Sequence, residues 1–300
     1  MSLFYFGTVT VTSLISGIPG ILLQRKVAAF AGAYDAIPSI AAAYSSRRML
    51  STYTGKPWRL RRSSDNDEMW SRFLGNGPHL DVAHTADFLN GSNGTIVEWA
   101  SQSGTWISDN EGTDGADATQ TTAASQPLYV ASGQNGRPVL RFDGTDDYLV
   151  TSSVPADGWS VSVCFSEAAA NKTILGAYKF SGGIEYRFYI KPRRPENKRQ
   201  YAAGSTGSSL LAGASVASGV QGMAGKNAYI NGASDGTIPA GSLADCNAIW
   251  IGATDFVSGG GSVDYFNGLI TEIIISTVTY SALQMADLSA AANAYWAVHA

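Results

Sequence analysis

The chain has 300 residues, of which 45% are hydrophobic and 15% are charged, so it can build one large domain or two small ones around a sizeable core. Charged residues are scarce compared with roughly a quarter in an average soluble domain. Glycine and aromatic residues are frequent, which favours an all-β protein with many turns. The formal net charge of −4 argues against a dedicated nucleic-acid-binding protein, which normally carries a positive excess.

The cysteine and histidine content excludes a disulfide-rich scaffold and an evident metal motif. The two cysteines, Cys164 and Cys246, both lie in predicted strands, so no disulfide framework is implied. We interpret them as buried thiols, with a single disulfide as the alternative. His79, His84 and His299 do not show metal-ligand spacing with the cysteines.

The N-terminal segment is uncharged and reads as an extended arm. Residues 1–24 contain no charged side chain, and Thr8–Thr12 alternates with a period of two, which is typical of a strand. A secretory signal would carry positive charge before its apolar core, and none precedes this one. We predict an apolar arm over 1–26 that contacts another subunit, followed by a single domain over 27–300. The alternative is that the arm packs on its own domain.

Two helices are predicted outside the strands. Residues 27–50 are rich in alanine and other good helix formers before a Gly-Lys-Pro turn, which predicts a helical lead-in. A C-terminal helix is expected to begin at Ser281, a favoured N-cap residue. Its apolar side is predicted at Leu283, Ala286, Leu288 and Ala291.

Basic residues concentrate between Arg47 and Arg62, which invites a nucleic-acid interpretation. Asp65, Asp67 and Glu68 follow directly. Because opposite charges lie so close along the chain, a solvated and locally neutralised surface is the interpretation we favour.

Runs of β-branched and aromatic residues recur after residue 94 and predict most of the strands. Val139–Phe142 and Tyr148–Val150 flank Asp143-Gly144, which is a strong hairpin or loop signal because glycine accepts positive φ and aspartate bonds its own backbone. Further strands are predicted over 159–165, 173–178, 186–190, 227–232, 248–252 and 265–275.

Several of these segments resemble known β-sandwich proteins. Residues 136–150, with the sequence G-R-P-V-L-R-F-D-G-T-D-D-Y-L-V, and the closing strand 265–275 resemble a concanavalin A-like jelly roll of the laminin-G type. Residues 42–66, 94–104 and 117–127 are similar to the catalytic domain of α-L-arabinofuranosidase B and to related phage-borne proteins. The resemblance covers about residues 40–296 and implies an all-β, concanavalin A-like jelly-roll β-sandwich, with an N-terminal arm and helix and a C-terminal helix.

The same resemblance implies an incomplete catalytic site. Hydrolysis of an arabinofuranoside uses two carboxyl groups, one as nucleophile and one as proton donor. The proton-donor position corresponds to Asp255, which follows Thr254 where the family has glycine. The region matching the nucleophile, Tyr186–Gly213, contains only Glu196, in a basic loop, and the family's adjacent cysteine pair is absent. We therefore expect a non-catalytic protein, with Asp255 as catalytic residue only if the chain is a hydrolase.

Two further groups of residues are candidates for binding. Asp143, Asp146 and Asp147 could offer oxygens to Ca²⁺, the one cofactor that the sequence suggests. The alternative is that these acids satisfy the backbone of their own turn. Trp106, flanked by glycine and small polar residues, is the best candidate for an exposed aromatic that stacks on a sugar, with Asp255 as a possible polar partner.

Three functions remain open from the sequence. We favour a non-catalytic structural or attachment protein of a viral (phage) particle, made in the cytoplasm without a signal peptide and located in the virion. Such a protein would bind other subunits through residues 1–24, could also bind a surface glycan, and would need neither nucleic acid nor a membrane span. The alternatives are a glycoside hydrolase of the α-L-arabinofuranosidase type and a carbohydrate-binding module.

Overall fold

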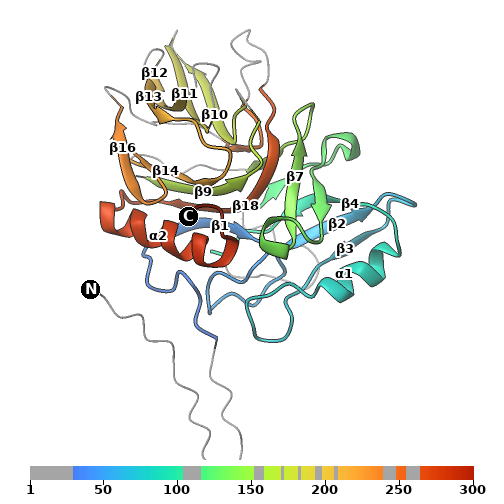
Figure 1. Cartoon of the computed structure of the whole chain (residues 1–300). Coiled ribbons are helices and arrows are strands. Elements are labelled where there is room, and N and C mark those ends of the chain that lie inside the picture. Colours follow the sequence, from blue (N-terminus) through green and yellow to red (C-terminus); the bar gives the residue numbers. More distant parts are fainter. Residues whose placement is uncertain are drawn as a thin grey trace, which may run out of the picture.

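The computed structural model describes residues 30–103, 116–151, 159–169, 172–181, 184–192, 198–205, 209–238, 248–254 and 264–300. These residues form 18 β-strands, two α-helices and two short 3-10 helices, which confirms the predicted all-β class (Figure 1). Every strand pairing in this described part of the chain is antiparallel.

The elements have the following bounds. The first half of the chain supplies β1 (Ile40–Ser45), β2 (Trp58–Arg62), β3 (Glu68–Trp70), α1 (Val82–Leu89), β4 (Gly94–Trp99), β5 (Ala118–Thr119), η1 (Ala123–Ser125), β6 (Leu128–Val130), η2 (Gln134–Gly136), β7 (Val139–Asp143) and β8 (Leu149–Thr151). The second half supplies β9 (Ser160–Ser166), β10 (Leu175–Ser181), β11 (Ile184–Lys191), β12 (Lys198–Ser205), β13 (Ser209–Ala214), β14 (Gly219–Ala224), β15 (Asn227–Ile230), β16 (Ala233–Thr237), β17 (Trp250–Ile251), β18 (Asn267–Ser276) and α2 (Ala282–Trp296).

The strand β18 is the centre of a first layer. On one side β18 pairs with β9, and on the other side its two halves pair with β7 and β1. The strands β14, β15 and β16 extend the layer beyond β9. Helix α2 contacts β9, β14 and β16 and lies along this layer on the side away from β10–β13 (Figure 1). Cys164 of β9 is a buried free thiol, as predicted, and Cys246 lies outside the described residues.

A second layer is built from β8, β17, β10, β11, β12 and β13, which pair in that order. Strand β5 connects β8 to β4, β2 and β3. One face of the second layer is apolar: Leu149, Leu175, Ile190 and Ile251 are fully buried in the main hydrophobic core. The predicted sandwich core therefore lies between the two layers, because apolar faces of packed sheets interdigitate there.

The helix predicted over 27–50 is wrong in its described part, because residues 40–45 form β1. Ala42 and Tyr44 face the main core, whereas Ala43 faces a smaller cluster that includes Met285 of α2. A strand buried on both faces has no alternation of apolar and polar residues, so its pattern resembles that of a buried helix. Packing against β18 thus overrides the helix propensity of the alanine run.

The predicted C-terminal helix is confirmed, including its first residue. The Ser281 side chain accepts a hydrogen bond from the Gln284 N–H, and the Gln284 side chain accepts one from the Ser281 N–H, which is a capping box. The predicted apolar side is wrong at Leu283, which is 71% exposed, because Met285 and Leu288 are the buried residues of the first turns. Neither α-helix in the described part has the length and apolar run that a membrane span would need.

The predicted turn at Asp143-Gly144 is a crossing between layers. Strand β7 pairs with β6 and β18, whereas β8 pairs with β5 and β17, and no pairing among the described residues joins β7 to β8. Gly144 has φ +81°, and a Cβ there would lie 2.7 Å from the Cβ of Asn267. Both facts favour glycine at the crossing.

Candidate functional site

The second layer has a face that points away from the core, which we call the outer face. Directly opposed residues of antiparallel strands share a face. The register therefore places six residues on the outer face: Val150 of β8, Trp250 of β17, Gly176 of β10, Tyr189 and Lys191 of β11, and Gln200 of β12. Their neighbours along each strand, such as Ile190 and Ile251, belong to the core.

Three half-buried aromatic side chains gather at the β17 side of the outer face, and we call them the aromatic platform. Trp250 stacks on Tyr148, with ring centroids 4.5 Å apart and an interplanar angle of 21°. The ring of Tyr265 lies 6.4 Å from that of Tyr148. All three keep part of their surface exposed, so they offer apolar ring surface with polar edges outside the core. The predicted sugar-stacking residue Trp106 lies outside the described residues.

The segment that leads to position 255 crosses the outer face at Gly176. A Cβ on Gly176 would lie 2.0 Å from Cγ2 of Thr254, so Thr254 occupies the space above this glycine. The N–H of Phe266 donates to the carbonyl oxygen of Gly252 at 2.7 Å, which ties this segment to the chain that enters β18. Asp255 itself, the predicted catalytic and sugar-binding residue, lies outside the described residues.

A connected set of polar side chains lies on the other side of Gly176, and we call it the polar chain. The Lys191 ammonium lies 2.5 Å from a carboxylate oxygen of Asp264, which also accepts a hydrogen bond from the Thr173 hydroxyl at 2.8 Å. The same ammonium lies 5.4 Å from the centre of the Tyr189 ring. The Gln200 amide donates to the Tyr189 hydroxyl at 2.9 Å. These contacts link Gln200 of β12, through Tyr189 and Lys191 of β11, to Asp264, which lies just before β18.

Neither Asp264 nor the aromatic platform was predicted from the sequence. Asp264 directly precedes the predicted closing strand, and that position was the available signal. Tyr148, Trp250 and Tyr265 each read as ordinary strand residues, and only the strand register brings them together.

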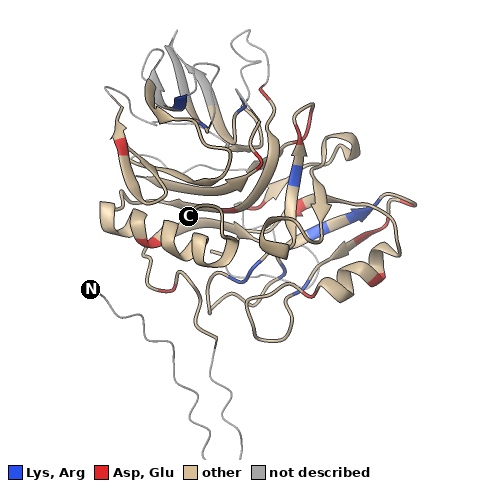
Figure 2. Ribbon diagram, in the orientation of Figure 1, with Lys and Arg blue, Asp and Glu red and all other residues tan. Residues whose placement is uncertain are grey.

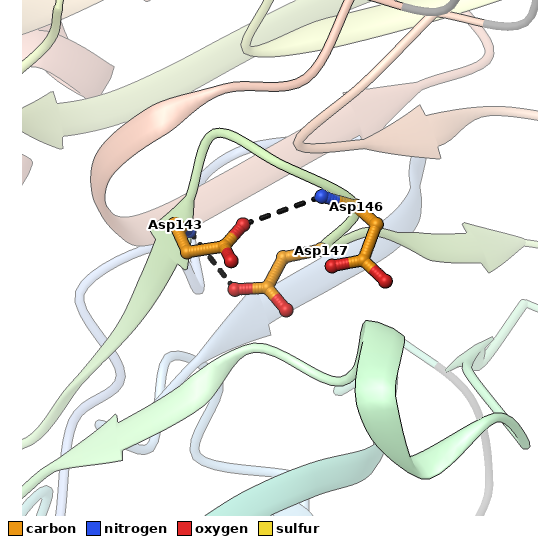
Figure 3. Close-up of side chains that lie close together, drawn as sticks. All are labelled: Asp143, Asp146 and Asp147. Carbon is orange, nitrogen blue, oxygen red and sulfur yellow. Dashed lines mark hydrogen bonds between the residues drawn. The ribbon is translucent and has the colours of Figure 1, made fainter.

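The three acidic residues predicted as a Ca²⁺ site are brought together. Carboxylate oxygens of Asp143, Asp146 and Asp147 lie within 4.8 Å of one another (Figure 3). They also serve their own turn, because Asp143 accepts from the Thr145 and Asp146 N–H groups and Asp147 accepts from the Asp143 N–H. The donor set suits a hard cation such as Ca²⁺, and the turn-satisfying alternative is equally visible.

Electrostatics distinguish Asp147 from its two neighbours. Burial, followed by the charge of Asp143, raises the pKa of Asp147 to about 7. The residue is only 5% exposed, which accounts for the dominance of burial. The pKa of Asp147 therefore lies in the neutral range, unlike that of an ordinary aspartate.

The segment that resembles the arabinofuranosidase turn, 94–104, has a structural role in its described part. The Gln102 amide accepts from the Met49 N–H at 2.8 Å and donates to the carbonyl oxygens of Ser45 and Arg47 at 3.0 and 2.8 Å. It thereby fixes the chain that leaves β1, because both amide N–H groups and the amide oxygen bond to backbone groups of that chain.

Basic and acidic residues lie close together on β2 and β3 (Figure 2). Arg59 lies 3.3 Å from Glu68 and 3.0 Å from Glu98, and Arg61 lies 2.7 Å from Glu68. These pairs agree with the locally neutralised surface predicted for this part of the sequence, except at Arg47, which is buried and pairs with Glu272.

Comparisons with known proteins establish the fold class. The sequence matches no model of a protein family, and no curated protein matches it. A solved GH54 α-L-arabinofuranosidase soaked with a cyclic sulfate inhibitor is similar with a TM-score of 0.59 and 13% identity, over 88% of this chain and 64% of that chain. A mutant of GH54 α-L-arabinofuranosidase soaked with 4-nitrophenyl α-L-arabinofuranoside gives 0.60 and 14%, over 88% and 64%.

A third structure agrees with these two. An arabinofuranosidase complexed with arabinofuranosyl-α-1,2-xylobiose gives a TM-score of 0.58 and 14% identity, over 87% of this chain and 64% of that chain. The chain thus spans 64% of the length of each enzyme. The chain therefore has a β-sandwich fold like that of these arabinofuranosidases. This confirms the resemblance seen in the sequence at the level of fold.

Proposed function

We propose that the chain binds carbohydrate through the aromatic platform. The observation that carries this proposal is the gathering of Tyr148, Trp250 and Tyr265 outside the core, beside the segment that leads to Asp255. The C–H face of a sugar ring packs on aromatic surface, while its hydroxyls need polar partners nearby. The Asp264 carboxylate, whose side chain is 17% exposed, supplies such a partner. The fold shared with arabinofuranosidases supports the same proposal.

Trp250→Ala tests the platform directly. Binding of arabinofuranosyl-xylobiose and of a panel of neutral polysaccharides is measured by isothermal titration calorimetry and affinity electrophoresis. Removing the stacked ring should weaken binding about tenfold or more, which corresponds to about 1.4 kcal/mol. Trp70→Ala is the matched control, because Trp70 is also half-buried but lies on β3. Unchanged affinity of the Trp250 variant, or no binding by the wild type, would refute the proposal.

Glycoside hydrolysis is the second candidate, and it rests on the fold shared over 88% of the chain. A retaining or inverting glycosidase uses two carboxyl groups. Asp255 corresponds to the proton donor by sequence resemblance. Asp264, which follows a short distance further along the chain, supplies a second carboxyl group. Release of 4-nitrophenol from 4-nitrophenyl α-L-arabinofuranoside measures this activity. Turnover that is lost in both Asp255→Asn and Asp264→Asn would assign hydrolysis, whereas carbohydrate binding alone predicts no turnover above background.

The role in a viral particle rests on sequence alone. Residues 1–24 lie outside the described residues, and the structural neighbours give no support to a virion location or to contacts between subunits. We retain the arm as a proposed subunit contact, and deletion of residues 1–24 tests it.

A further inference from the structure

We infer that the edge of β13 receives the N-terminal arm of a second copy of the chain, which adds residues 8–12 to the second layer as a further strand. This inference rests on the arm contact proposed above and names its receiving surface, and it is independent of carbohydrate binding. It is carried by the open edge of β13, by the state of the other outer strands and by the match between the two segments.

Strand β13 forms an outer edge of the second layer. Among the described residues it pairs with β12 alone. Its sequence, SLLAGA, contains neither a charged residue nor a proline. Leu211 is 49% exposed, and Gly213 is also exposed, so backbone that no side chain shields is accessible there. Every second residue of a paired strand turns its N–H and C=O away from the partner, so β13 offers these groups to an incoming strand.

The other outer strands of the described sheets are covered or unsuited to pairing. The far edge of β1 is bonded by the Gln102 N–H at 2.7 Å and by the Ser103 hydroxyl at 2.6 Å. Strand β3 has three residues, and its Glu68 pairs with arginines of β2. Strand β16 carries Asp235 and pairs with β15 across a shift in register. Short length, charge and irregular register all discourage edge-to-edge pairing, which leaves β13 as the open edge of the described part of the chain.

Strand β13 has a core side and an outer side. Ala212 belongs to the main core, and Leu210 packs against that core. Leu211 is directly opposite Gln200, so it lies on the outer face of the layer. A strand added beside β13 should therefore place apolar side chains on the core side and polar side chains on the outer side.

The alternating run in the arm meets this requirement. As a strand, residues 8–12 would direct Val9 and Val11 to one face and three threonines to the other, and both residue types favour strands. Charge agrees as well. Residues 1–24 carry none, and two charged neighbours of β13, Arg199 and Asp235, are paired with each other at 2.5 Å. The arm and the edge can therefore join without burying an unpaired charge.

The donor of the arm is a second copy because β13 and the chain before β1 lie on opposite sides of the first layer. Tyr34 packs with Met285 and Leu288 of α2, whereas β13 belongs to the second layer (Figure 1). The chain's own arm would have to pass around the first layer to reach β13, and the arm of a neighbouring molecule would not. Residues 13–29 can span about 60 Å when extended, which allows residues 8–12 to reach that neighbour.

Cysteine cross-linking of the full-length protein tests the receiving edge. One preparation carries Thr10→Cys, and a second, marked by an affinity tag, carries Leu211→Cys. Both residues are expected on the outer side of paired strands, so mixing under mild oxidation should join the two preparations by a disulfide. Thr8→Cys and Thr12→Cys in place of Thr10→Cys cover a shift in register.

Leu283→Cys is the matched control for Leu211→Cys, because Leu283 is also an exposed leucine but lies on α2. The best of the three arm variants should cross-link to Leu211→Cys about fivefold or more above its yield with Leu283→Cys, since a disulfide needs close Cβ atoms. The wild-type chain, oxidised in the same way, gives the background from its native cysteines.

Charges in the arm test the assignment of its faces. Val9→Asp combined with Val11→Asp should weaken self-association of the full chain about tenfold or more, measured by sedimentation velocity, because both charges would enter the core side. Thr8→Asp combined with Thr10→Asp is the matched control and should change it less than about threefold, because these residues face solvent. Circular dichroism melting curves verify that the compared variants are folded.

The outcomes separate the receiving edge from the arm contact itself. Equal cross-linking at Leu211 and Leu283, in a chain whose self-association is lost on deletion of residues 1–24, would overturn β13 as the edge while the arm contact stands. A cross-link that forms only when both cysteines are in one molecule would overturn the second copy as donor. A full-length chain that stays monomeric at all concentrations would overturn the arm contact and the inference together. None of these results bears on carbohydrate binding, which the Trp250 variant tests.

Discussion

Asp147 is a single carboxyl group whose burial makes a whole turn sensitive to pH. Its side chain accepts the Asp143 N–H at 2.9 Å and lies beside the carboxylates of Asp143 and Asp146. The folded-state pKa of about 7 exceeds the ordinary value of 3.8. The folded protein therefore holds this proton more tightly than the unfolded chain does.

The sign of the pH dependence follows from that difference. The stability contributed by neutral Asp147 is fully present below about pH 4 and is lost as the pH rises through about 7. The loss is at most about 4 kcal/mol at 1.36 kcal/mol per pKa unit. Asp147→Asn keeps the acceptor oxygen without the charge, so the variant should unfold at higher denaturant than wild type at pH 8 and at similar denaturant at pH 4.5. Equal pH dependence of both proteins would show that Asp147 titrates normally.

Calcium provides a second measurement on the same residues. A bound cation favours ionised carboxylates, so millimolar Ca²⁺ at pH 8 should raise the melting temperature of the wild type if the acidic turn is a site. The Asp147→Asn variant should respond less. Equal shifts in both proteins would show that Ca²⁺ binds elsewhere, and the acidic turn would then keep only its role of satisfying its own backbone.

Glu272 is the residue on which the packing of α2 and of the segment before β1 depends. It forms a buried ion pair with Arg47 at 2.6 Å and accepts from the Trp296 indole at 3.0 Å and from the Tyr34 hydroxyl. Glu272→Gln would leave the Arg47 charge buried without a counter-charge. We expect a loss of about 3–5 kcal/mol in the free energy of unfolding, measured by chemical denaturation.

An exposed pair is the control for Glu272. Glu167 lies 2.8 Å from Arg141, and both side chains are at least 39% exposed. Glu167→Gln should change the free energy of unfolding by less than about 1 kcal/mol, because solvent screens such pairs. Equal losses in the two variants would contradict the special role of burial at Glu272.

At the scale of elements, local sequence signals predicted the structure where residue types favour a strand or a cap. Strand β9 was found because serine alternates with larger apolar residues, and β18 because β-branched residues dominate it, although both strands are buried along almost their whole length. The start of α2 was found from the Ser281 cap. Strand β1 was missed because it consists mainly of alanines, which favour a helix, and because both of its faces are covered, so that no alternation of apolar and polar residues marks it.

The candidate site was predictable only in part. The acidic turn is local, and its three carboxyl groups were identified from neighbouring positions. The aromatic platform joins residues from three distant segments, and the polar chain joins four. Their proximity depends on the register of β8, β17, β10 and β11, which periodicity within one strand cannot provide.

Gln102 tests how strongly one side chain fixes the start of the fold. Gln102→Leu would leave the Met49 N–H and the carbonyl oxygens of Ser45 and Arg47 without this partner. The expected loss is about 2–4 kcal/mol in the free energy of unfolding, since buried backbone groups are costly to leave unpaired. Gln221→Leu is the control, because Gln221 is also buried but donates a long hydrogen bond of 3.5 Å to the Lys191 carbonyl oxygen, and its amide oxygen has no partner in the described part of the chain. Similar losses in both variants would argue against the specific role of Gln102.

At the scale of the whole molecule, the described residues close a sandwich core and a second cluster under α2. The main core draws on strands from β1 to β18, and the second cluster begins with Tyr34. Within the described part of the chain, these clusters draw on strands of both layers and on α2. We expect the domain predicted over 27–300 to fold without residues 1–24, because its strands already supply apolar faces to one another.

Deletion of residues 1–24 tests the proposed arm. We expect the truncated protein to keep a β-dominated circular dichroism spectrum and the melting temperature of the full chain, while losing any self-association seen for the full chain by light scattering. Leaving a dozen large apolar side chains in water would be a large liability, since burial of each contributes about 1.5–3 kcal/mol. Unfolding of the truncated protein, with a monomeric full chain, would show that the arm is part of the core.

The crossing from β7 to β8 joins the acidic turn to the aromatic platform without an intervening residue, since Tyr148 follows Asp147 directly. The two are also held by one neighbour: Ser125 accepts the Tyr148 N–H through its carbonyl oxygen and donates its hydroxyl to Asp146. A change that rigidifies this crossing therefore affects both the acidic turn and the aromatic platform. A sugar that prefers one ionisation state of the turn must shift its proton affinity by the same free energy that the proton shifts the sugar affinity, because linkage is reciprocal. Carbohydrate affinity would then depend on pH, because the residue that titrates directly precedes Tyr148 in the chain.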